Sequence, residues 1–172
     1  VQKYPHWGKT VVVRDEDATE GPNVNHNVVR EMLEEAIKAL TNGGGWQSLF
    51  PSYRTGEIVA VKVNCQWPRV PTQPKVVGAI INGLVRIGIP QNRIVVWDAD
   101  ADTMVGSGMY GINTEFSGVR IMATDKLSDP FDPSKSLDIE GNTTHLSRIL
   151  TDAAHLINVP VLKNHWEAGI TF

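Results

Sequence analysis

The chain contains five short apolar runs that are rich in β-branched residues. They cover residues 10–14, 58–64, 94–98, 119–125 and 155–163. A strand with one face in water alternates apolar and polar residues, whereas a strand buried on both faces is apolar throughout. Because these runs do not alternate, the pattern predicts strands of a mostly parallel sheet.

Two segments between these runs have the helical period, with apolar residues recurring every three or four positions. One lies within residues 25–43, where Asn25 or Asn27 is suited to cap the first turn. The other lies within residues 72–88, with Thr72 as its candidate cap. Helices between such strands are typical of the crossovers that join parallel neighbours.

A shorter helix is predicted at 144–153. The alternation of strands and helices predicts an α/β fold, namely a three-layer sandwich with a mostly parallel sheet built from βαβ units. We expect one domain over 1–172, with an N-terminal tail at 1–8 and a long loop at 126–142, which contains two Asp-Pro steps. The sequence ends on the apolar segment GITF without a cap or turn, so we expect a domain truncated at its C-terminus.

Composition restricts the classes of function. The net charge of −3 comes without a block of lysine or arginine, which argues against nucleic acid as a partner. No apolar run approaches the roughly 18 residues of a membrane span. The start, VQKYPHWGKT, lacks the basic and apolar regions of a signal peptide, so none is expected in this sequence. Cys65 is the single cysteine, which excludes an intrachain disulfide and an iron–sulfur cluster within this chain.

The stretch RIVVWDADADT places Asp98, Asp100 and Asp102 on alternate positions after an apolar run. An EF-hand calcium loop is excluded, because Thr103 stands where glycine is needed and Met109 where the bidentate glutamate belongs. A haloacid-dehalogenase-like phosphatase would use Asp98 as its nucleophile, but Asp102 occupies the threonine position of that pattern.

Three other interpretations fit parts of this region. An Asp-x-Asp pair, Asp98 and Asp100, could bind a divalent metal together with a nucleotide diphosphate. The segment 106–111 fits G-x-G-x-x-G, but its glycines do not directly follow a strand and the INTEFS segment after them is too short for a dinucleotide-binding helix. Alternatively, Asp100 and Asp102 only face water in a polar turn.

Polar residues that follow the apolar runs form a second candidate site. They are Asn64, Cys65, Asp98, Asp125, Lys163, Asn164 and His165. If the strands are parallel, these residues gather at the carboxyl edge of the sheet, where open α/β folds bind ligands. Lys163 would hold an anionic group, His165 would act as acid, base or ligand, and Asp98 would orient the imidazole or bind a cation. Cys65, beside a buried strand, is more typical of a core residue than of a nucleophile.

The chain resembles the family catalogued as domain of unknown function 362. The segments that carry the resemblance are IVAVKVNCQ, QPKVVGAIINGL, IVVWDADADTMVGSGMYGIN, GVRIMATD and AHLINVPVLKNHWEAGITF. The most specific of them contains the pattern Asn158-x-Pro-x-x-Lys163-x-His165, followed by Gly-Ile-Thr. The resemblance extends from about Thr10 to Phe172.

The resemblance has several implications. Family members usually continue into a second half-domain, so we expect that half to be missing from this sequence. Some relatives carry ferredoxin-like cysteine clusters, which suggests redox association, but this chain has no such cysteines, so that implication does not transfer to it. Many relatives look exported through a twin-arginine leader, which implies an exported or periplasmic location. Asn64, Asp98, Asn158, Lys163 and His165 all lie in the segments that define the resemblance.

Our leading hypothesis is a soluble α/β domain that binds an anionic small molecule or a metal ion at the carboxyl edge of its sheet. The residues leave open whether it is an enzyme. Candidate catalytic residues are Lys163, His165 and Asp98, candidate ligand-binding residues are Asn64, Asn158, Asn164 and Asp125, and candidate ligands of a divalent metal are Asp98 and Asp100. The alternatives are a non-catalytic electron-transfer or assembly module with an iron–sulfur partner, and phosphoryl transfer at Asp98. A homo-oligomer is compatible with each.

Overall fold

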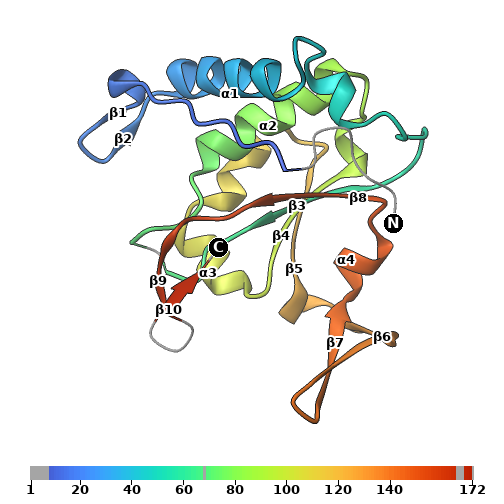
Figure 1. The fold of residues 1–172 in the computed structure, drawn as a ribbon. Coiled ribbons are helices and arrows are strands. Elements are labelled where there is room, and N and C mark those ends of the chain that lie inside the picture. The colour runs from blue at the N-terminus through green and yellow to red at the C-terminus, as the bar shows by residue number, and fades with distance from the viewer. Residues whose placement is uncertain (1–7, 68, 166–168, 172) are drawn as a thin grey trace.

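A computed structural model describes residues 8–67, 69–165 and 169–171. Its centre is a four-stranded sheet in which every neighbouring pair is parallel, in the order β5-β4-β3-β8 (Figure 1). The strands are β3 (Val59–Val63), β4 (Ile94–Asp98), β5 (Arg120–Ala123) and β8 (His155–Val159). Four of the five predicted apolar runs thus form the sheet, which confirms the predicted α/β class.

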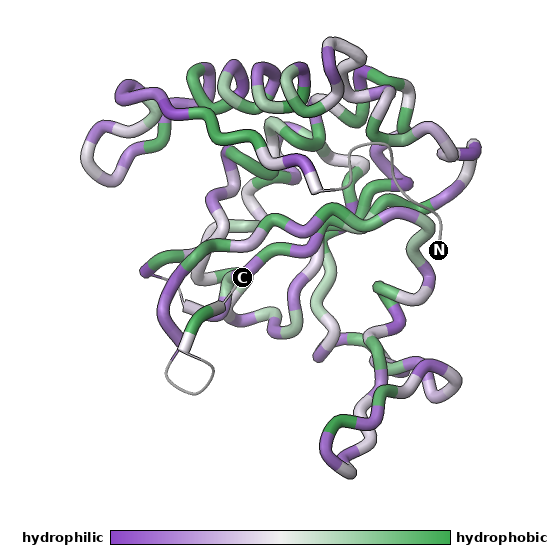
Figure 2. The backbone as a smooth tube through the Cα atoms, viewed as in Figure 1, coloured by the Kyte–Doolittle hydropathy of each residue, from purple (hydrophilic) through white to green (hydrophobic). Residues whose placement is uncertain are grey.

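Helices lie on both faces of this sheet. On one side, α2 (Pro74–Arg86) packs over the main core, and α1 (His26–Leu40) packs against α2 (Figure 1). The side chain of Asn25 accepts hydrogen bonds from the first backbone N–H groups of α1, which confirms it as the cap. Figure 2 shows polar and apolar residues alternating along α1, as expected of a helix with one solvent-exposed face. A smaller core on the other face is covered by α4 (Arg148–Asp152).

The order of the strands creates a switch point between β3 and β8. From β3 the chain moves outward to β4 and β5, and it then returns to the opposite side of β3 to form β8. The α2 crossover and the α4 connection therefore lie on opposite faces of the sheet. In open α/β sheets, this geometry opens a crevice at the carboxyl ends of the two strands that flank the switch point.

The remaining elements are short. They are η1 (Glu16–Ala18), β1 (Thr19–Glu20), β2 (Asn23–Val24), η2 (Trp46–Leu49), η3 (Gln91–Arg93), α3 (Ala101–Gly106), η4 (Met109–Thr114), η5 (Thr124–Lys126), β6 (Phe131–Ile139), β7 (Asn142–Ser147), β9 (Lys163–His165) and β10 (Gly169–Thr171). No helix in the described ranges is long and apolar enough to cross a membrane.

Two predicted elements are wrong. Residues 10–14 form no strand, because the adjoining Lys9 binds the C-terminal end of α1, where its ammonium donates to the Leu40 carbonyl at 3.1 Å. This segment therefore runs along α1, away from the sheet, and Val12 is 73% exposed. The loop predicted at 126–142 is instead mostly β6, which pairs with β7 in a hairpin that projects from the domain (Figure 1).

The hairpin also shortens the predicted helix at 144–153 to α4, because β7 extends to Ser147. Glu140 and Gly141 make its turn with φ of 51° and 80°, a conformation that glycine adopts without strain. Of the predicted tail at 1–8, residues 1–7 lie outside the described part of the chain.

Candidate functional site

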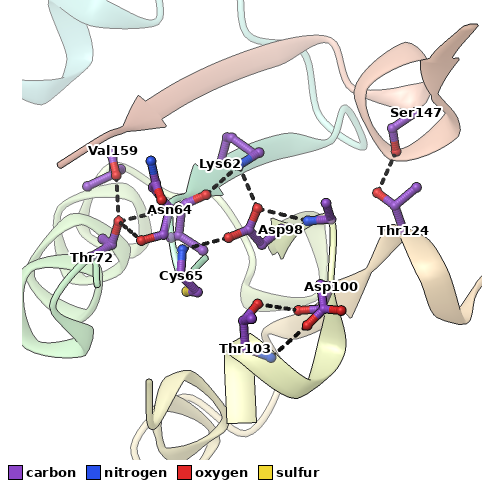
Figure 3. A network of polar contacts seen from close by, with 12 residues as sticks. Lys62, Asn64, Cys65, Thr72, Asp98, Asp100, Thr103, Thr124, Ser147 and Val159 are labelled. Atoms are coloured by element: carbon purple, nitrogen blue, oxygen red, sulfur yellow. Dashed lines mark hydrogen bonds and ion pairs between the residues drawn. The ribbon is translucent and has the colours of Figure 1, made fainter. Parts of the chain in front are cut away.

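Asp98 ends β4 at the carboxyl edge of the sheet, and 9% of its side chain is exposed. Its Oδ1 accepts hydrogen bonds from the Lys62 ammonium at 2.7 Å and from the Ala99 backbone N–H at 2.8 Å. Its Oδ2 accepts one from the Cys65 backbone N–H at 2.7 Å (Figure 3). These three donors hold the carboxylate in one orientation and stabilise its negative charge.

Lys62 was not predicted as a site residue, although it is the closest charged partner of Asp98. The register of the sheet places it between Trp97 on β4 and Asn158 on β8. Its ammonium also lies 5.7 Å from the centroid of the Trp97 ring, within the range of a cation–π contact. The available signal was a lysine inside the otherwise apolar run IVAVKVN, because a lysine in a buried strand needs a partner.

Thr72 joins the ends of the two strands at the switch point. It is 2% exposed, and its hydroxyl accepts from the Asn64 backbone N–H and donates to the Val159 carbonyl, both at 2.8 Å (Figure 3). The prediction that Thr72 caps the second helix is wrong, because Gln73 occupies the N-cap position. The hydroxyl instead satisfies backbone groups that both strands leave unpaired where they end.

Cys65 follows β3 and is fully buried in the main core. Burial raises the pKa of its thiol, and the nearby Asp98 carboxylate raises it further, while a hydrogen bond with Ser107 acts in the opposite direction. A neutral, enclosed thiol is a weak nucleophile and a weak metal ligand. This environment fits the interpretation of Cys65 as a core residue.

Lys163 begins β9 and reaches toward the same edge. Its ammonium donates to the Val70 carbonyl at 3.2 Å, which ties β9 to the loop after β3. Burial lowers the pKa of Lys163, the nearby Cys65 and Asp98 side chains oppose that shift, and the charge of Lys62 adds to it. Lys163 therefore lies within electrostatic range of all three groups.

His165 and Asn164 follow on the same short strand, which pairs antiparallel with β10. Alternate residues of a strand point to opposite sides, so His165 shares the side of Lys163 and Asn164 takes the other. Lys163 and His165 are half-buried, whereas Asn164 is exposed. Of these three residues, Lys163 and His165 therefore face the protein.

Asp100 and Asp125 hold the segment after β4. The Asp100 side chain accepts from the Thr103 backbone N–H at 2.7 Å and caps α3, and this hydrogen bond lowers the pKa of Asp100. Asp125 accepts from the Ala101 backbone N–H and forms an ion pair with Lys126, both at 3.1 Å. Both carboxylates thus have local partners that account for their positions.

The two predicted metal ligands, Asp98 and Asp100, turn toward different partners (Figure 3). Among the residues that the structure describes, no three histidine, cysteine, aspartate or glutamate side chains form a group suited to hold a metal ion. Hard divalent cations require several oxygen ligands around one point. Asn158 is exposed beside Lys62, and Asn64 contributes its backbone to the contact with Thr72.

The structure therefore brings Lys62, Cys65, Asp98 and Lys163 into one electrostatic environment at the switch point. Asp100 and Asp125 instead stabilise the turn after β4. The described charges of the cluster are two lysines and one carboxylate, and this carboxylate is already paired with Lys62.

This architecture and this cluster define a parallel α/β domain with a polar site at the carboxyl edge of its sheet. Residues 59–172 match the model of the family described as domain of unknown function, DUF362, and the chain belongs to this family. The match begins at β3 and includes each candidate site residue. No curated protein and no solved structure matches the chain.

Proposed function

We propose that the carboxyl edge of the sheet binds a small anionic molecule, with Lys163 as its principal contact. The supporting observation is the pairing of charges in the cluster. Asp98 forms an ion pair with Lys62 at 2.7 Å, whereas no carboxylate of the described residues lies within ion-pair distance of Lys163. The Lys163 ammonium is thus available to an anion that approaches the carboxyl ends of β3 and β8, where open α/β sheets bind ligands.

The partial burial of Lys163 increases the benefit of binding an anion. Burial removes water from the ammonium, which disfavours its charged form and lowers its pKa. An anion beside it would compensate for the lost hydration. Electrostatic attraction is also stronger in a partly desolvated position than at an exposed lysine such as Lys135.

If the site is catalytic, His165 is the residue for proton transfer. It lies two residues after Lys163 on the same side of β9, and an imidazole can donate or accept a proton near neutral pH. Asp98 would act indirectly by holding Lys62. Phosphoryl transfer at Asp98 is less favoured, because both of its oxygens already accept hydrogen bonds and a nucleophile needs an oxygen directed at phosphorus.

The test is titration of the purified chain with inorganic phosphate and with malonate at constant ionic strength, followed by calorimetry. Lys163→Ala should weaken the binding of the preferred anion by about tenfold or more, since a hydrogen bond to a charged group contributes about 1.5–3 kcal/mol. Lys135→Ala, which removes an exposed lysine of β6, is the matched control and should bind as the original chain does.

Unchanged binding of both anions in Lys163→Ala would contradict the proposed site. Native mass spectrometry with elemental analysis of the same sample reports any retained ligand or metal and the number of subunits. A screen of phosphatase activity with magnesium tests the phosphoryl-transfer alternative, which requires that Asp98→Asn abolish turnover.

One observation favours the alternative of a non-catalytic assembly module. β8 pairs only with β3 among the described strands, so its other edge presents backbone N–H and C=O groups, and Leu156 beside it is 50% exposed. A partner chain, including an iron–sulfur protein, could add a strand there. A stable complex that Leu156→Lys disrupts, with no turnover by the chain itself, would support this function over anion binding at Lys163.

A further inference from the structure

A cavity lies on the face of the sheet that α4 covers, away from the cluster around Asp98. It has a volume of about 230 Å³ and is bounded by residues of β4 and β5, by the loop after η5 and by α4. Its lining consists of Ile58, Val95, Arg120, Met122, Leu127, Ser128, Asp129, Arg148, Ile149 and Asp152. None of these residues belongs to the cluster around Asp98, so the cavity is a separate feature of the fold.

Arg148 in this cavity has an unsatisfied donor. Its Nε is buried and has no hydrogen-bond partner among the residues that the structure describes, while its Nη2 forms an ion pair with Asp129. In arginine, Nε–H and one Nη2–H point in the same direction and form the edge that binds a carboxylate through two parallel hydrogen bonds. Asp129 therefore occupies only half of an edge that can hold two oxygens.

Buried polar groups are rarely left without a partner, so a group of this kind indicates a missing one. Asp129 is a weak competitor for the edge, because 65% of its side chain is exposed and it lies on a surface loop. Arg120, the first residue of β5, adds a second guanidinium to the lining. Among the described residues, no carboxylate forms an ion pair with Arg120.

Apart from Ser128 and Asp152, the rest of the cavity lining is apolar. Val95 is 2% exposed and Ile149 is 6% exposed, and both belong to the smaller core, against which Ile58 and Met122 pack. At about 30 Å³ for each water in the liquid, the volume equals about eight waters. The cavity therefore has room for a molecule of only a few heavy atoms, with a charged end at the arginines and an apolar end at the sheet.

We propose that this cavity binds a small monocarboxylate that carries a short apolar chain. The carboxylate occupies the Nε–Nη2 edge of Arg148 in place of Asp129, and Arg120 contributes a second positive charge. The apolar chain contacts Val95, Met122 and Ile149. A neutral molecule of the same shape leaves the guanidinium donors unpaired, and an inorganic anion leaves the apolar surface unused, so the cavity discriminates against both.

The proposal is tested with butyrate as the probe, by NMR of the chain labelled at its methionine and isoleucine methyl groups. Butyrate should shift the methyl signals of Met122 and Ile149 to saturation, whereas Met104, buried on the other face of the sheet, should not respond. Butyramide, the neutral analogue, should produce no saturable shift. Acetate should bind more weakly than butyrate, by up to about fourfold for each methylene removed.

Three variants locate the contact. Arg148→Lys keeps the positive charge but removes the two parallel N–H donors of the guanidinium, and it should weaken butyrate binding by about tenfold. Asp129→Asn removes the competing carboxylate and should strengthen binding by about threefold or more. Arg30→Ala, on the exposed side of α1, is the control and should leave binding unchanged.

The opposite response of the two cavity variants separates a binding role from a merely structural one. If only water occupies the cavity, butyrate will not shift Met122 and Ile149, and the proposal is overturned. It is equally overturned if butyramide binds as butyrate does, or if Asp129→Asn fails to strengthen binding. Lys163→Ala should leave the butyrate-dependent shifts of Met122 and Ile149 unchanged, so failure of the first site and failure of this one are distinguishable.

Discussion

Replacing Asp98 by asparagine tests whether this residue is the structural centre of the cluster. The substitution keeps the shape of the side chain and removes its charge and one acceptor oxygen. The asparagine can place its oxygen toward Lys62 and Ala99 or toward Cys65, but not toward both. At least one donor, either the buried Cys65 N–H or the pair on the opposite side, then faces an NH₂ group.

The expected loss of stability follows from these contacts. A buried donor that loses its partner costs about 1–3 kcal/mol, and a hydrogen bond to a charged group contributes about 1.5–3 kcal/mol. Lys62 is 31% exposed, so its ammonium regains some hydration when the ion pair is removed, and the full free energy of that contact is not expected to be lost. We therefore expect Asp98→Asn to lower the free energy of unfolding by about 2–4 kcal/mol, which corresponds to a Tm lower by about 4–16 °C for a domain of this size.

The assay is urea unfolding monitored by circular dichroism, with the midpoint and slope fitted for each variant. Asp102→Asn is the matched control, because Asp102 is an exposed aspartate of the same stretch, and it should stay within about 0.5 kcal/mol of the original chain. If Asp98→Asn were equally close to the original chain, Asp98 would not be the buried acceptor described here.

Two further predictions concern the other members of the cluster. Cys65 is fully buried, and burial raises the pKa of its thiol. Iodoacetamide should therefore alkylate the folded chain at least about a hundredfold more slowly than the chain in urea, as measured by mass spectrometry. Equal rates would contradict the burial of Cys65. Because the pKa of Lys163 is lowered, the affinity for the preferred anion, measured by calorimetry, should begin to fall at a pH below the ordinary lysine pKa of about 10.4. The folded state releases the Lys163 proton before the unfolded state does, so stability rises with pH across that window, and an affinity that stays constant up to about pH 10 would contradict the shift.

The parallel sheet was predictable because burial on both faces leaves a local signature. Each of β3, β4 and β5 follows from an apolar run, and the resemblance of the sequence to the DUF362 family was confirmed by the family match. The run at 10–14 has the same signature but forms no strand, since composition does not specify which surface an apolar segment packs against. In this case the partner is the end of α1, through Lys9.

The hairpin β6–β7 was not predicted, because its strands lack the apolar signature of a buried sheet. Most of its residues are exposed, so neither face imposes an alternation of apolar and polar positions. The two Asp-Pro steps indicated a loop, and the second, Asp132-Pro133, lies at an irregularity of the β6–β7 pairing between Asp132 and Ser136. The turn at Glu140 and Gly141 was the one local signal of a hairpin.

In the candidate site, too, the sequence predicts where residues lie but not which residues they contact. That Cys65, Asp98 and Lys163 approach one edge follows from the parallel order of the strands, because the carboxyl ends of parallel strands lie together. The sequence pattern could not show that Lys62 pairs with Asp98, since that contact depends on the register of β3 against β4. The pairing changes the chemistry of the edge. With the Asp98 charge balanced by Lys62, the carboxylate is less available to a metal ion or to phosphorus, and Lys163 becomes the cation at this edge that an incoming anion would meet.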